Sequence, residues 1–137
     1  MKMKMLLVDD QDGILVLYSP IFEEMGYEVV TCNNGSEAID WIWQNHEKPD
    51  IIVTDLDMPA FNGLQVLNQA YERYGKIPAI IMTGGFRSHS ESECRKITSH
   101  VIHKPFLPDE LIALVDKVLA EASPRSEKAV EKNHQAA

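Results

Sequence analysis

Apolar positions along the chain follow two alternating spacings. Short, continuous apolar segments are typical of strands buried on both faces, and they cover residues 3–8, 27–31, 51–55, 77–82 and 101–102. The segments between them carry apolar residues at helical spacing and cover residues 12–25, 36–45, 63–74, 88–99 and 108–122. Strands and helices that alternate in this way predict an α/β fold, a doubly wound parallel sheet of five strands with five helices.

The first helical segment contains a proline in its interior. Pro20 has no backbone N–H, and a proline at such a position costs about 3 kcal/mol. The apolar stripe nevertheless continues through Phe22 and Met25, which we expect to face the core. We therefore predict a kink at Pro20, with the helix ending at Gly26.

The end of the chain shows weaker patterning. In the segment 88–99 only Cys94 and Ile97 are apolar, so we expect its surface to be the most mobile. Residues 123–137 carry polar and mixed-charge side chains without an apolar stripe. We therefore predict one domain over residues 1–122 and a disordered polar tail over 123–137.

Composition narrows the classes of function. A net charge of −8 argues against direct binding of nucleic acid through its backbone. Cys32 and Cys94 are far apart and have no metal-ligand spacing. No apolar segment is long enough to insert into a membrane, and no signal peptide is recognisable, so a reducing cytoplasm is the expected location.

Polar side chains follow four of the predicted strands. Asp9 and Asp10 follow the first, Asp55 ends the third, Thr83 follows the fourth and Lys104 follows the fifth. Each alone is compatible with an ordinary cap or turn. Because parallel strands share one carboxyl edge, we expect these groups to converge where open α/β sheets place their chemistry.

Three clustered carboxylates repel one another strongly. Two unit charges about 4 Å apart repel by about 4 kcal/mol at an effective dielectric constant of 20. Either one acid is protonated or a divalent cation lies among them. Oxygen ligands without histidine or cysteine favour Mg²⁺. A metal, a lysine and a hydroxyl can together hold a phosphoryl group while Asp55 attacks its phosphorus.

These residues resemble the receiver domains of bacterial two-component response regulators. The resemblance extends over residues 3–121. The motifs that carry it are, in chain order, Val8-Asp9-Asp10, Asp55-Leu56-Asp57-Met58-Pro59 with Asn62-Gly63, Met82-Thr83-Gly84 and Lys104-Pro105-Phe106.

The resemblance implies a flavodoxin-like (β/α)5 receiver fold and a role in signal transduction rather than enzymatic turnover. Asp55 would accept a phosphoryl group from the phosphohistidine of a sensor histidine kinase or phosphotransfer protein. The fourth helix, fifth strand and fifth helix would then change their binding to a downstream protein that the sequence does not identify. Implied site residues are Asp9, Asp10, Asp55 and the backbone carbonyl of Asp57 for Mg²⁺, Thr83 and Lys104 for the phosphoryl group, and Pro105 after a cis peptide bond.

The sequence departs from the family pattern at several modulatory positions. Val101 stands where a switching aromatic residue is common, three residues before the lysine. His100 should face the other side of the strand, and we interpret it as a surface histidine. Asp57 adds charge at the rim and is expected to alter phosphate lifetime, with Gly85 a further modulatory position. Thr98-Ser99 replaces the glycine that often precedes the fifth strand.

Other interpretations remain open from sequence. A haloacid-dehalogenase-like phosphatase would use Asp55 and Asp57 as nucleophile and acid, but Pro59 occupies the threonine position of that motif. An FMN-binding module would need a Ser/Thr-rich phosphate loop after the first strand. The chain could also be the excised receiver of a longer DNA-binding regulator or hybrid kinase rather than a free-standing domain.

Overall fold

The computed structural model describes residues 2–85 and 91–122. Their strands form one parallel sheet in the order β2-β1-β3-β4-β5. The strands are β1 (Lys4–Val8), β2 (Glu28–Cys32), β3 (Ile51–Asp55), β4 (Ala79–Thr83) and β5 (Val101–His103). The helices are α1 (Asp12–Glu24), α2 (Gly35–Gln44), α3 (Gly63–Tyr74), α4 (Glu91–Ile97) and α5 (Pro108–Ala122). The predicted doubly wound α/β class is confirmed.

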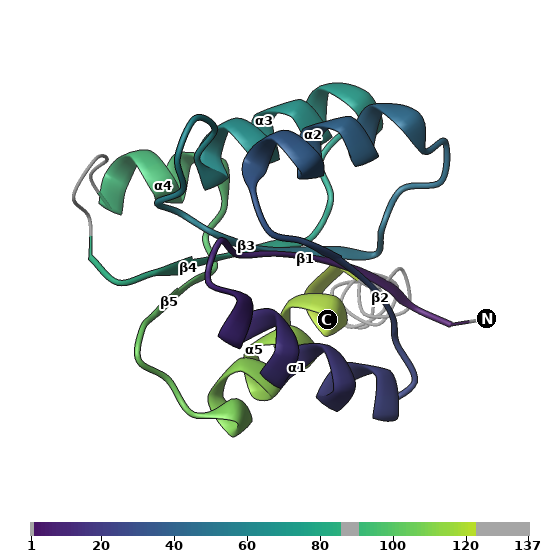
Figure 1. Cartoon of the computed structure of the whole chain (residues 1–137), viewed down its shortest axis with the longest axis vertical. Coiled ribbons are helices and arrows are strands. Elements are labelled where there is room, and N and C mark those ends of the chain that lie inside the picture. Colours follow the sequence, from purple (N-terminus) through teal and green to yellow (C-terminus); the bar gives the residue numbers. More distant parts are fainter. Residues whose placement is uncertain (1, 86–90, 123–137) are drawn as a thin grey trace, which may run out of the picture.

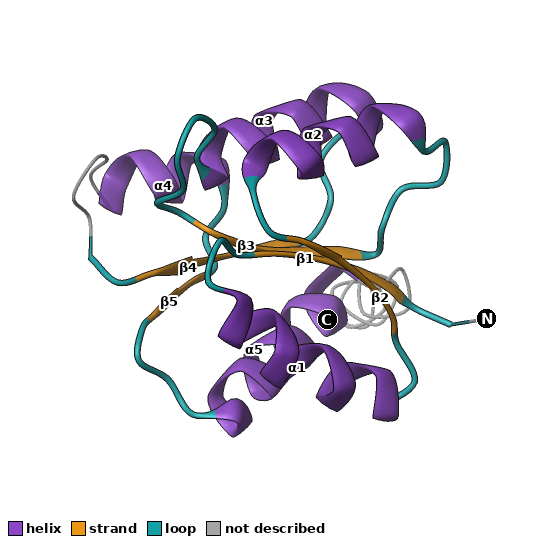
Figure 2. Cartoon of the chain, viewed as in Figure 1, coloured by secondary structure: helices purple, strands orange, loops and turns teal. Residues whose placement is uncertain are grey.

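Helices cover both faces of the sheet. Helices α1 and α5 lie on one face, and α2, α3 and α4 lie on the other (Figure 1). The loops that leave the carboxyl ends of the strands gather at one edge (Figure 2). Because β1 lies inside the sheet, between β2 and β3, the chain winds in opposite directions on its two sides. Such a switch point opens a crevice at the carboxyl edge of the strands.

Alternating residues of the strands supply two separate cores. Leu6 and Ile52 pack toward α2 and α3, whereas Leu7 and Val53 pack toward α1 and α5. Every residue of β3 is buried, which explains its continuous apolar sequence. A shift of one residue in register would turn the side chains of a strand to the opposite face of the sheet. Packing in the two cores therefore fixes the register, and with it the position of the last residue of each strand.

The first helix differs in detail from the prediction. The helix continues through Pro20 without a break, as predicted, and the kink expected there stays a prediction. It ends before Gly26, whose φ of 103° is readily adopted only by glycine. Met25 was predicted to face the core but is 44% exposed. Its N–H still donates to the carbonyl of Ile21 at 3.2 Å, but it caps the helix one turn beyond Phe22, the last residue of α1 that is buried in the core.

Two predicted segments lie partly or wholly outside the described residues. The predicted helix 88–99 begins within residues 86–90, and its described part is shorter, Glu91–Ile97. The predicted tail, residues 123–137, also lies outside. Elsewhere the strand bounds differ from the prediction by one or two residues, because an apolar pattern does not mark where the backbone pairing of a strand begins and ends.

Candidate functional site

Three aspartates meet at the carboxyl edge of β1 and β3. Asp9 and Asp10 follow β1, and Asp55 is the last residue of β3. Asp9 and Asp55 are buried, whereas Asp10 is exposed. One carboxylate oxygen from each lies within 4.8 Å of the others. The sequence prediction that these acids converge agrees with this geometry.

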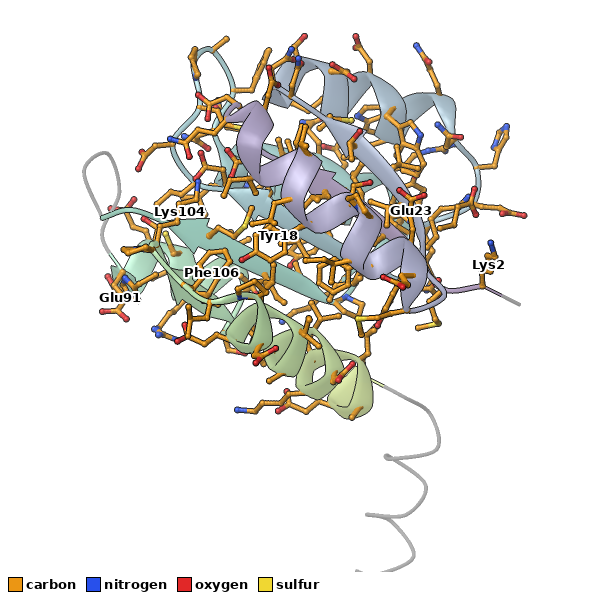
Figure 3. The ribbon with its side chains drawn as sticks, turned by 60° about the horizontal axis from the view of Figure 1, so that its bottom comes forward. Lys2, Tyr18, Glu23, Glu91, Lys104 and Phe106 are labelled. Atoms are coloured by element: carbon orange, nitrogen blue, oxygen red, sulfur yellow. The ribbon has the colours of Figure 1, made fainter. Side chains whose placement is uncertain are left out.

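A lysine from the far edge of the sheet completes the cluster. Lys104 Nζ lies 2.8 Å from Asp9 Oδ2 and 3.3 Å from Asp55 Oδ1. Its backbone N–H donates to the carbonyl of Thr83 at 2.7 Å, and the Lys104–Pro105 peptide is cis, as the resemblance implied. Next along the chain, Phe106 contacts Tyr18 of α1, and Figure 3 shows these two rings below Lys104.

Burial and like charge give the site an unusual protonation balance. Burial, and then the charge of Asp9, raise the pKa of Asp55 to about 7, although Lys104 acts in the opposite direction. Burial alone would lower the pKa of Lys104, but its hydrogen bond to Asp9 and the charge of Asp55 outweigh this effect and raise it. Without a cation, one lysine therefore does not fully compensate three carboxylates.

Backbone groups fix the acids in place. The N–H of Gln11 donates to Asp9 Oδ1 at 2.8 Å. A Cβ at Gly63 would lie 2.3 Å from the carbonyl oxygen of Asp55, so only glycine lets α3 begin this close to the end of β3. Sequence reasoning missed the contribution of Gln11, because a backbone donor has no residue-type signal.

Thr83 is engaged with the loop that follows β4. Its hydroxyl donates to the carbonyl of Gly85 at 2.7 Å, and the N–H of Gly85 donates back to the hydroxyl at 3.0 Å. Thr83 is fully buried, and the residue before it, Met82, pairs with Asp55. The threonine thus ends the strand next to the phosphoacceptor candidate while closing a small turn at Gly85.

The remaining predicted positions lie around this cluster. Val101 pairs with Ile81 and packs, half-buried, into the core beneath α3 and α4. Asp57 is partly exposed in the loop after β3, where its charge contributes to raising the pKa of Cys94 in α4, after burial and Glu93. His100 is not the surface histidine that was expected. Its side chain is 19% exposed, and its Nε2 lies 3.2 Å from Glu121 Oε2, because α5 covers the start of β5.

The donor set fits a hard divalent cation. Asp9, Asp10 and Asp55 offer only oxygen, the ligand type that Mg²⁺ prefers. Among residues 2–85 and 91–122, this is the only group of three or more acidic, histidine or cysteine side chains close enough to share an ion. A cation among them would also offset the repulsion that raises the pKa of Asp55.

Comparison of the sequence with known protein families identifies the family to which the chain belongs. Residues 5–116 match the family model of the response regulator receiver domain. The chain belongs to the response regulator receiver family. This membership removes the basis for the phosphatase and FMN alternatives, whose motifs are incomplete in the sequence.

Individual relatives agree with this assignment. The receiver is 34% identical to Sporulation initiation phosphotransferase F of Bacillus subtilis, a match that covers 87% of this chain and 95% of the relative. It is 32% identical over 93% of its length to the Alkaline phosphatase synthesis transcriptional regulatory protein PhoP of the same organism, but spans only 54% of that protein. The solved response regulator TrrA of Thermotoga maritima, in complex with Mg²⁺ and BeF, superposes with a TM-score of 0.73 at 30% identity, over 86% of this chain and 99% of that one.

None of the helices in the described part of the receiver combines the length and the apolar character needed to cross a membrane.

Proposed function

We propose that the receiver accepts a phosphoryl group on Asp55 from the phosphohistidine of a sensor histidine kinase or a phosphotransfer protein. The proposal rests on the carboxylate oxygens of Asp9, Asp10 and Asp55, one from each of which lies within 4.8 Å of the others. Lys104 Nζ lies 3.3 Å from Asp55 Oδ1. The arrangement places a carboxylate nucleophile, Asp55, next to the positive charge of Lys104. A signalling domain of this kind acts in the cytoplasm, and it promotes only its own phosphorylation and dephosphorylation rather than the turnover of a separate substrate.

In the forward step, a carboxylate oxygen of Asp55 forms a bond to phosphorus. The bond from phosphorus to the donor's imidazole nitrogen breaks, and its electron pair leaves with the imidazole. Mg²⁺, held by Asp9, Asp10 and Asp55 with the backbone carbonyl of Asp57, would neutralise charge on the phosphoryl oxygens. Lys104 forms an ion pair with the transferred group, and water later attacks its phosphorus to restore the carboxylate.

Thr83 connects this reaction to the loop after β4. Its hydroxyl proton can be donated to only one acceptor at a time. Donation to a phosphoryl oxygen requires loss of the bond to the Gly85 carbonyl. We propose that the freed turn carries the signal to α4, β5 and α5, where a protein target binds. Val101 has no polar group or ring with which to follow the movement of Thr83.

Asp57 is proposed to set the lifetime of the phosphorylated state. Its carboxylate stands two residues after Asp55 in the rim loop, where it can accept a hydrogen bond from the attacking water. Asp57→Asn should therefore lengthen the half-life of the phosphorylated receiver at least about threefold, an effect of less than one hydrogen bond to a charged group. Decay of phosphorylated protein, followed by intact mass in both proteins, would measure it. An unchanged or shorter half-life rejects this role.

The proposed reaction is tested most simply with a small phosphodonor. Incubation with acetyl phosphate and Mg²⁺ should add one phosphoryl group, detected by intact mass. Chelation of the metal should abolish the gain, and so should Asp55→Asn. Asp57→Asn serves as the matched control, since it changes a neighbouring acid but keeps the acceptor. Labelling that persists in Asp55→Asn would contradict the proposal.

The relatives include both longer regulators and a protein of similar length to this receiver. The receiver spans 54% of PhoP but 95% of the sporulation phosphotransferase. It therefore resembles both a module of a larger regulator and a free-standing domain. Either form uses the same phosphoacceptor chemistry.

A further inference from the structure

Helix α4 has little apolar contact with the rest of the receiver. Of its residues Glu91–Ile97, only Cys94 is fully buried, and Ile97 is partly buried. Figure 1 shows α4 at the end of the layer that also contains α2 and α3, over the β4 side of the sheet. An element with so small a buried apolar surface is held mainly by its polar contacts. The position of α4 therefore depends on the groups at its ends.

Thr98 joins the end of α4 to the sheet. It is 5% exposed, and its hydroxyl donates to the carbonyl of Ala79, the first residue of β4, at 2.8 Å. The same oxygen accepts the N–H of His100 at 3.2 Å. The N–H of Thr98 donates to the carbonyl of Cys94 at 2.9 Å and closes the last turn of the helix. One side chain thus connects α4, β4 and the start of β5.

Tyr71 supports the same point from α3. Its hydroxyl donates to the carbonyl of Ile97 at 3.2 Å. Burial raises the pKa of Tyr71 to about 12, so the hydroxyl keeps its proton over the physiological range. Helix α3 is itself anchored by its buried residues, such as Leu67 and Ala70. Displacement of Ile97 would therefore break the bond from Tyr71 rather than drag α3 along.

We propose that Thr98 and Tyr71 form a latch that holds α4 in its resting position and thereby opposes activation at Asp55. The opposite end of β4 carries Thr83, whose bond to Gly85 must break for its hydroxyl to reach a phosphoryl group. This inference rests on the proposed function, because activation is defined there as occupation of Asp55. Thr98 and Tyr71 are positioning residues and contact no reacting atom.

The latch has a consequence that a purely structural role lacks. If α4 leaves its resting position on activation, every interaction present only at rest lowers the population of the competent state. Weakening such an interaction raises that population and tightens the binding of a phosphoryl mimic by the same factor. Loss of one hydrogen bond changes the equilibrium about fivefold. A residue that only stabilised the fold would leave the affinity unchanged or reduce it.

The test measures the affinity for beryllofluoride in the presence of Mg²⁺. Thr98→Val keeps the shape of the side chain but removes its hydroxyl, and Tyr71→Phe removes only the phenolic oxygen. Both should bind beryllofluoride about fivefold more tightly than the unaltered receiver. Thr98→Ser restores the hydroxyl and should return the affinity to within about twofold of the original value.

Tyr74→Phe is the matched control. Tyr74 lies on the same helix, and its hydroxyl contacts the carbonyls of Ile42 and Asn45 in and after α2, not α4. Its loss should leave beryllofluoride affinity unchanged. The latch is wrong if Thr98→Val binds no more tightly than the unaltered receiver. It is equally wrong if Tyr74→Phe gains as much as Tyr71→Phe, since the effect would then be general loosening.

Amide hydrogen exchange without metal or beryllofluoride separates the latch from the proposed function. Thr98→Val should speed exchange of the backbone amide at position 98 about tenfold or more, relative to amides of β1 and β3, when compared with the unaltered receiver. If the unaltered receiver binds no beryllofluoride while this exchange result holds, the proposed function fails and the anchoring of α4 stands. If exchange is unchanged in Thr98→Val, the latch itself is overturned.

Discussion

Asp55 combines two demands that oppose each other at the scale of a single residue. As a nucleophile it must be ionised, yet burial and the charge of Asp9 raise its pKa to about 7. Lys104 lies 3.3 Å away and relieves only part of this penalty. Because the remaining repulsion between the carboxylates is not compensated, the site should bind a cation. The proposed nucleophile therefore also destabilises the metal-free fold.

This conflict predicts a pH-dependent gain in stability for Asp55→Asn. Below about pH 4, Asp55 is protonated in both the folded and unfolded states, so substitution changes little. Between pH 4 and the folded pKa of about 7, the unfolded state ionises first and the stability of the original protein falls. Above pH 7 the full penalty remains, and Asp55→Asn should be more stable by about 1–3 kcal/mol.

Chemical denaturation with a chelator at pH 5 and pH 8 measures this difference. Saturating Mg²⁺ at pH 8 should shrink it, because the cation binds only the folded site of the original protein. A gain that is equal at both pH values, or larger at pH 5, would show that Asp55 is not the strained acid.

At the scale of elements, the site depends on how closely the N-terminus of α3 approaches β3. The capping box between Asn62 and Gln65 starts the helix, and Gly63 lets it start against the backbone of Asp55. From the sequence, Asn62 could be recognised only as part of a turn and not as a helix cap. The need for glycine at Gly63 appears only when the two elements are packed together.

Gly63→Ala should destabilise the receiver by about 1–3 kcal/mol, the range typical of overpacking. Its added Cβ would lie 2.3 Å from the Asp55 carbonyl oxygen, which belongs to a central strand and cannot move aside. Gly13→Ala is the control, because nothing lies within 4 Å of its Cβ in α1. Thermal unfolding should show little loss or a small gain for Gly13→Ala. Equal losses in both variants would contradict this packing.

At the scale of the whole molecule, the core on the α2, α3 and α4 face of the sheet encloses both thiols. Cys32 and Cys94 are buried on the same face of the sheet, and burial followed by the charge of Glu37 raises the pKa of the Cys32 thiol to about 12. Neither can be modified as a thiolate at pH 8 unless the fold opens.

A thiol reagent such as 5,5′-dithiobis(2-nitrobenzoic acid) should therefore modify the folded receiver slowly, and both cysteines rapidly in denaturant. Cys94 should react before Cys32, because α4 is the less firmly held element. Identification of the first labelled peptide by mass spectrometry checks the order. Rapid modification of Cys32 in the folded protein would contradict the arrangement of the core.

The sequence specified the sheet and most of the acidic site because both follow from simple periodicity. Asp9, Asp55 and Lys104 end parallel strands, and parallel strands share an edge. The contacts that it did not specify join polar groups across long separations or through the backbone. Thr98 was marked in the sequence only as a departure from the family's glycine, and nothing indicated its bond to Ala79. The pairing of His100 with Glu121 depends on how α5 crosses β5.

We propose that Asp55, and no other acid of the cluster, carries the phosphoryl group. Sodium borohydride reduces an aspartyl phosphate to homoserine, which leaves a permanent mark in the sequence. After treatment with acetyl phosphate and Mg²⁺, peptide mass spectrometry should find homoserine at position 55 and unchanged aspartate at Asp9, Asp10 and Asp57. Homoserine at one of those three positions, or none after confirmed incubation with donor and metal, would contradict the account.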